Sequence, residues 1–105
     1  MLTIIARLKM RAGKEEEALE RLRTMVSAAE AEEPGTLAYI CHRSQNDPPE
    51  IIFVEMYEDD AALQAHGRTA HMGEFRSGFG QLFDASQVKI ERLERVAGFV
   101  RAGAG

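Results

Sequence analysis

Apolar and polar residues alternate with a period of two near the start of the chain, and three later segments are also rich in the residues typical of strands. This period of two predicts β-strands, in which successive side chains point to opposite faces of a sheet. The four segments are residues 3–11, 36–44, 51–57 and 86–96. In the last one the phase of the pattern slips between Ile90 and Leu93, which predicts a β-bulge.

Helical spacing of apolar residues predicts two further regions between these strands. In residues 14–33, apolar positions recur every three or four residues, three glutamates occupy the first turn, and Pro34-Gly35 ends the pattern. The second region is broken. Asp59 or Asp60 can cap a short helix over residues 61–67, and a second helix is expected from about residue 71 to 83.

The resulting order βαββαβ predicts a ferredoxin-like α+β domain, in which helices cover one face of an antiparallel sheet. We expect this domain to span residues 1–97 and the Gly- and Ala-rich residues 98–105 to form a flexible C-terminal tail.

The strand at residues 51–57 is apolar on both sides, with Ile52, Val54 and Met56 on the side away from Phe53. A sheet wetted on one face would carry polar residues there. A second copy packing sheet to sheet would cover this open face, so we expect a homodimer. A ligand or a different partner is the alternative.

The composition of the chain argues against several classes of partner. The chain has 105 residues, of which 45% are hydrophobic and 29% charged, as in a soluble globular domain. Its net charge is −4 and its basic residues are interleaved with acids, so no nucleic-acid partner is expected. With no signal-like start and no membrane-length apolar stretch, we expect no membrane contact and a cytoplasmic location. The single Cys41 agrees with a reducing compartment and is expected to be a buried small hydrophobe.

His66 and His71 flank the predicted helix break and are the natural acid–base candidates at neutral pH. Either one could instead cap a helix or form a hydrogen bond in a core. A five-residue step turns about 140° around a continuous helix, which would put the two imidazoles on different faces, and His42 adds no ligand spacing. No metal site is therefore expected.

A pocket between helices and sheet is the expected substrate site. Met72, Phe75 and Phe79 recur at helical spacing and would line it with large soft side chains, although ordinary core packing would use the same stripe. Tyr39 and Arg43 share one side of one predicted strand, and Tyr57 shares one side of the next with Glu55, so these polar groups could project into the pocket.

Five motifs together closely resemble the antibiotic biosynthesis monooxygenase (ABM) superfamily, over about residues 2–96. They are Thr3-Ile4-Ile5-Ala6-Arg7-Leu8-Lys9, Gly13-Lys14-Glu15-Glu16, Glu33-Pro34-Gly35-Thr36-Leu37-Ala38-Tyr39, Glu55-Met56-Tyr57-Glu58-Asp59, and Leu63-x-Ala65-His66-x2-Thr69-x-His71-Met72. The resemblance implies a dimeric α+β barrel with a pocket in each subunit. It also implies the best-known activity of the superfamily, which is oxygenation of quinols and polycyclic phenols without metal or flavin.

Around His66 and His71 the chain is most similar to the quinol monooxygenase branch. The haem-degrading branch has Asn, Trp and His where this chain has Ala6, His66 and Arg76, so haem degradation is not expected. The leading hypothesis is a cofactor-independent monooxygenase acting on a small aromatic quinol or polyphenol with O₂, with His66 or His71 as the base.

Two other hypotheses stay open. A non-oxidative isomerase of a small polar metabolite would need inward cationic groups such as Arg7, Arg43 or Arg76. A small-molecule-binding or stress-response module without turnover would need no acid–base group at all.

Overall fold

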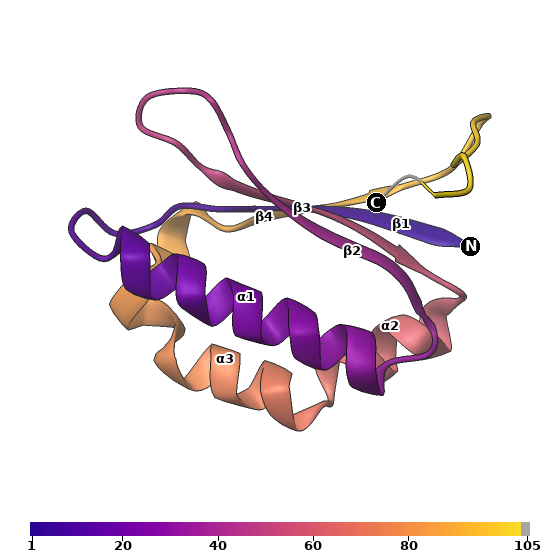
Figure 1. Cartoon of the computed structure of the whole chain (residues 1–105), viewed down its shortest axis with the longest axis horizontal. Coiled ribbons are helices and arrows are strands. Elements are labelled where there is room, and N and C mark those ends of the chain that lie inside the picture. The colour runs from indigo at the N-terminus through magenta and orange to yellow at the C-terminus, as the bar shows by residue number, and fades with distance from the viewer. Residues whose placement is uncertain (104–105) are drawn as a thin grey trace.

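The computed structural model describes residues 1–103, in which four strands and three α-helices follow the predicted order (Figure 1). The elements are β1 (Leu2–Leu8), α1 (Glu15–Glu32), β2 (Thr36–Arg43), β3 (Ile51–Tyr57), α2 (Asp60–Gly67), α3 (Ala70–Leu82), a 3₁₀ turn (Ala85–Gln87) and β4 (Lys89–Leu93). The strands form one antiparallel sheet in the order β2-β3-β1-β4.

All three helices lie on one side of the sheet, with α1 and α3 running side by side beneath it (Figure 1). The short α2 follows β3 and leads directly into α3. This arrangement confirms the predicted ferredoxin-like α+β fold. None of the helices in residues 1–103 is long and apolar enough to cross a membrane. The cytoplasmic location stays a prediction.

The predicted bulge in the last strand is wrong. β4 pairs with β1 in unbroken register, with Ile90 opposite Ala6 and Leu93 opposite Thr3. The two apolar residues therefore lie on opposite faces of a regular strand. The prediction was wrong because it assumed that both lie on the same face. The register shift in the sheet falls instead in β2, between Thr36 and Ala38.

The two-sided apolar character of β3 is confirmed. Ile51, Phe53 and Tyr57 face the helices and are at most 2% exposed, whereas the alternate residues Ile52 and Val54 are only half-buried. Burial of the helix-facing side chains against α1 and α3 supplies the core.

The opposite, open face carries a row of apolar side chains across three strands. Ile5 on β1 pairs with Val54 on β3, which pairs with Ile40 on β2, and Ile40 is 51% exposed. In the described chain no helix lies on this face (Figure 1). Residues 95–99 border a shallow hollow at one end of this open face, beside Met56 and Leu93. The C-terminal tail therefore lies next to the face, which the prediction of a homodimer did not take into account.

The rest of the tail forms no helix or strand through residue 103. Its flexibility stays a prediction, and residues 104–105 lie outside the described residues.

Gly35 is needed where α1 turns into β2, because a Cβ there would lie 2.7 Å from the Cβ of Ala62 on α2. Gly35→Ala should destabilise the fold by about 1–3 kcal/mol, since backbone would have to move. Gly73→Ala is the matched control: its site on α3 is open and alanine favours helix, so stability should rise by up to about 1 kcal/mol. Chemical denaturation measures both. Equal effects of the two substitutions would contradict this packing.

Candidate active site

The carboxylate of Glu33 is buried at the end of α1. Pro34 follows it and cannot continue the helix, and the backbone N–H of Glu33 donates to Ala29 as the last helical bond. This ending turns the Glu33 side chain inward, where it is only 5% exposed. Thr36, the first residue of β2, donates its hydroxyl to Oε1 of Glu33 at 2.7 Å and fixes its orientation.

Two imidazoles meet this carboxylate, one on each oxygen. Nδ1 of His66, near the end of α2, lies 2.7 Å from Oε1, and Nε2 of His71, in the first turn of α3, bonds to Oε2. Between the helices, Thr69 donates to the carbonyl of His66 and accepts from the N–H of Met72. The expectation that a five-residue step separates the imidazoles is therefore wrong, because it assumed a continuous helix.

The Glu33 carboxylate is held in its ionised form. Burial alone would raise its pKa, but the hydrogen bonds from Thr36, His71 and His66, together with the charge on His66, outweigh burial and hold the pKa below the ordinary value of 4.5. A buried carboxylate between two imidazoles stabilises positive charge on either of them.

The imidazole of His66 lies between two tyrosine rings. Its centroid is 5.1 Å from that of Tyr39 in an edge-on arrangement and 5.5 Å from that of Tyr57. Nδ1 is bonded to Glu33, and Nε2 has no hydrogen-bond partner among residues 1–103. Because none of these residues buries an unpartnered polar side-chain atom, Nε2 is open to a cavity.

Glu55, on β3, is a second buried carboxyl beside His66. Its environment shifts its pKa in the direction opposite to that of Glu33. Tyr57 donates to its Oε1 at 2.5 Å, yet burial dominates and raises the pKa of Glu55. Burial, and the nearby carboxylates, also raise the pKa of Tyr39 and Tyr57, so both hydroxyls keep their protons. The site thus pairs one carboxyl whose pKa is lowered, Glu33, with one whose pKa is raised, Glu55.

A cavity of about 620 Å³, here called the inner cavity, lies between the sheet and the helices. Its walls are mostly aliphatic and aromatic, and its polar side chains come from five positions. It is lined by Ile4, Ala6, Leu8, Met25, Tyr39, Phe53, Glu55, Leu63, His66, Met72, Phe75, Arg76, Phe79, Val88, Ile90 and Arg92. The unpartnered Nε2 of His66 therefore meets an apolar chamber.

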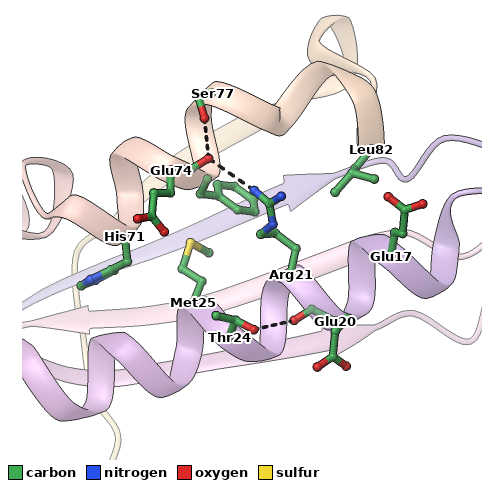
Figure 2. Close-up of a pocket in the computed structure, with 10 residues that line it drawn as sticks. Glu17, Glu20, Arg21, Thr24, Met25, His71, Glu74, Ser77 and Leu82 are labelled. Carbon is green, nitrogen blue, oxygen red and sulfur yellow. Dashed lines mark hydrogen bonds between the residues drawn. The ribbon is translucent and has the colours of Figure 1, made fainter.

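A second hollow of about 580 Å³, here called the outer groove, runs between α1 and α3 (Figure 2). His71 lies at one end of it and Leu82 at the other, while Arg21 reaches across to donate to the carbonyl of Glu74 at 3.3 Å. The groove is more polar than the inner cavity. The two histidines therefore border different spaces, with the Glu33 carboxylate bonded to both.

Comparison with known proteins identifies the family. The family model described as "Antibiotic biosynthesis monooxygenase" matches residues 1–78. This chain belongs to the ABM family.

Three relatives agree with this assignment. The Bacillus subtilis (strain 168) protein named "Putative monooxygenase YcnE" is 28% identical over 85 residues, which cover 81% of this chain and 88% of that protein. The crystal structure of PA3566 from Pseudomonas aeruginosa is 35% identical with a TM-score of 0.83, covering 91% of this chain and 94% of that one. An ABM-named structure from Caulobacter crescentus CB15 is 27% identical with a TM-score of 0.84, covering 91% and 90%.

Most of the predicted site residues of this ABM chain come together in space. Tyr39, Met72, Phe75 and Phe79 line the inner cavity with His66. Phe75 and Phe79 also pack on Phe83, so the aromatic stripe is core and cavity wall at once.

Three predicted site residues lie elsewhere. His71 borders the outer groove, and Tyr57 is fully buried behind His66 without lining the inner cavity. Arg43 is not at the site, because it comes near the end of β2 and lines a separate hollow beside α1 together with Cys41. Burial raises the pKa of the half-buried Cys41 thiol to about 11, as expected for a structural cysteine.

Sequence reasoning missed Glu33 as a site residue. It stands at the end of a helix rich in exposed glutamates, and nothing in the apolar pattern distinguishes it from them. The signal was its place before Pro34-Gly35 in the family motif. Arg92 on β4, which lines the inner cavity, was missed too. Glu33, His66 and His71 also bring three ligand-type atoms within 4.8 Å of one another.

Glu55→Gln should remove a loss of folding stability that depends on pH. Because the pKa of Glu55 is raised on folding, the wild-type chain loses stability as pH rises from about 4.5 through the raised pKa. The Gln variant still accepts from Tyr57, so its stability relative to wild type should rise with pH above about 4.5 and level off once the pH passes the raised pKa. Thermal denaturation from about pH 5 to about pH 8 tests this. A stability difference that does not change with pH would show that Glu55 ionises normally.

Proposed function

We propose that this chain is a cofactor-independent monooxygenase that oxidises a small aromatic quinol or polyphenol with O₂, and that His66 is its base. The observation that carries this proposal is the unpartnered Nε2 of His66 at an apolar cavity, while Nδ1 is held by the buried Glu33 carboxylate. Membership of the ABM family and the names of relatives support a general monooxygenase-like role.

The first step is removal of a phenolic proton by Nε2 of His66. The imidazolium that forms is stabilised because Nδ1–H donates to the ionised Glu33, as in other carboxylate–histidine pairs. Thr36 and His71 hold the carboxylate in place for this task. His71 then acts as a positioning residue, since it does not border the inner cavity.

The resulting phenolate is electron-rich enough to reduce O₂ directly. For a hydroquinone, one oxygen atom enters the ring and the other leaves as water, so hydroquinone plus O₂ gives hydroxyquinone plus water. All four electrons come from the substrate. The proton held on Nε2 of His66 returns to the oxygen that leaves, and no external reductant is needed.

The walls of the inner cavity suit such a substrate. A volume of about 620 Å³ falls within the usual range for small-molecule sites, and its aromatic and aliphatic lining favours a flat apolar ring. Tyr39, Phe75 and Phe79 offer ring faces and edges, while Met72 is a soft side chain that adapts to shape. A bound ring that displaces water from the cavity would also strengthen the charge interactions of the His66–Glu33 pair.

His66→Asn should lower oxygen uptake on a responsive quinol by at least about 100-fold, because it removes the base. The matched control is His42→Asn, since His42 is exposed on β2 away from the cavity, and its uptake should equal wild type. An oxygen electrode with purified protein and a quinol panel provides the measurement. Full uptake in His66→Asn would eliminate His66 as the base.

A second candidate function has one observation in its favour. Arg76 and Arg92 both line the inner cavity, and a guanidinium suits a carboxylate or phosphate. An isomerase of a small anionic metabolite would use Arg76 first, because Arg92 already pairs with Asp60 at 2.7 Å. Arg7 pairs with Glu50, and Arg43 lies elsewhere. Conversion of an anionic metabolite without oxygen, lost in Arg76→Gln, would favour this candidate. Binding without any conversion would indicate a non-catalytic module.

We also propose that two copies pair through the open sheet face, which the apolar row of Ile5, Ile40 and Val54 supports. Val54→Lys would bury a charge at the centre of this contact and should give monomers at micromolar concentration. Ser77→Lys, on the exposed side of α3, is the control and should keep the wild-type mass. Light scattering distinguishes the two, and a monomeric wild type would overturn the proposal.

A further inference from the structure

The Glu33, His66 and His71 cluster, which serves the proposed base, also has the donor set of a metal site. It joins two imidazole nitrogens and one carboxylate, from three different helices or helix ends, within 4.8 Å of one another. We propose that this cluster binds one divalent transition-metal ion of the zinc class. The proposal does not depend on the monooxygenase activity.

The distances require little rearrangement. Zinc binds nitrogen and oxygen at about 2.0–2.2 Å, so neighbouring ligand atoms around one tetrahedral ion lie roughly 3.0–3.5 Å apart. Nδ1 of His66 and Oε1 of Glu33 are already 2.7 Å apart. Side-chain rotations would have to move each imidazole slightly away from the carboxylate and bring the two ring nitrogens, now within 4.8 Å of each other, to roughly 3.5 Å or less.

The chemistry of the donors selects the metal class. Two imidazoles with one carboxylate suit Zn²⁺, Co²⁺, Ni²⁺ or Fe²⁺, whereas Ca²⁺ and Mg²⁺ prefer sites built wholly from oxygen. The hydroxyl of Thr36 bonds to the Glu33 carboxylate at 2.7 Å and provides the outer support that metal-binding carboxylates need.

An ion can reach the cluster from the outer groove. The His71 side chain is 11% exposed and borders that groove, and the exposed carboxylate of Glu32 lies 3.9 Å from its Nδ1. On the other side His66 borders the inner cavity, so water or a small ligand could complete the coordination.

Metal binding and the proposed base role exclude each other. The ion would take Nδ1 of His66 and the Glu33 carboxylate, the same two groups whose hydrogen bond stabilises the imidazolium. If the chain oxidises a quinol, Zn²⁺ should therefore inhibit that oxidation in proportion to the fraction of chains that bind the ion.

The test titrates the chelator-treated protein with Co²⁺, followed by the visible absorption of bound Co²⁺, and then displaces Co²⁺ with Zn²⁺. We expect one ion per chain. Glu33→Gln, which keeps the side-chain shape, should weaken binding at least about 100-fold, and Thr36→Val, which keeps all three ligands, about 10–100-fold. Circular dichroism shows whether each variant is folded.

Two controls make the outcome decisive. His42→Asn removes the one remaining histidine, and Glu32→Gln removes the exposed neighbouring carboxylate. Both should bind within about twofold of wild type. Binding that survives Glu33→Gln, or that is lost in His42→Asn, would overturn the proposed site, as would no binding at 1 mM Co²⁺, roughly the weak limit of specific affinity. None of these readouts requires turnover, so failure of the oxygenase proposal would be seen separately.

Discussion

The buried carboxylate of Glu33 is the constraint on which the rest of the site depends. An ionised group at this depth is tolerated only because Thr36, His66 and His71 each bond to it. Those three partners come from β2, α2 and α3. The carboxylate therefore connects all three elements to the end of α1. The break between α2 and α3 allows two histidines only five residues apart to approach one acid from different directions.

The two faces of the sheet have different roles. On the helix side, Phe53 and Tyr57 build a core that opens into the inner cavity beside His66. On the other side, Val54 and its neighbours form an apolar surface that no helix of residues 1–103 covers. The separation explains how one short domain can carry both an apolar outer surface and a cavity on the opposite face.

Much of the fold follows from the sequence because the relevant signals are local. Alternation in β1, the glutamate-rich start of α1 and the Asp59 cap of α2 all act over a few residues. The strand face of β4 was misread because its apolar residues serve opposite faces of the sheet. The site was predictable only in part: His66 and the Phe75 stripe stand out by residue type, whereas the role of Glu33 depends on contacts between residues 33 positions apart in the chain.

The central claim is that His66, held by Glu33, meets a phenolic substrate in the inner cavity. A crystal structure of the chain with a phenol that cannot be oxidised tests it most directly. The account predicts the phenolic oxygen about 3 Å from Nε2 of His66, with the ring against Phe75 and Phe79. A phenol bound instead in the outer groove at His71, with the inner cavity empty, would contradict the account.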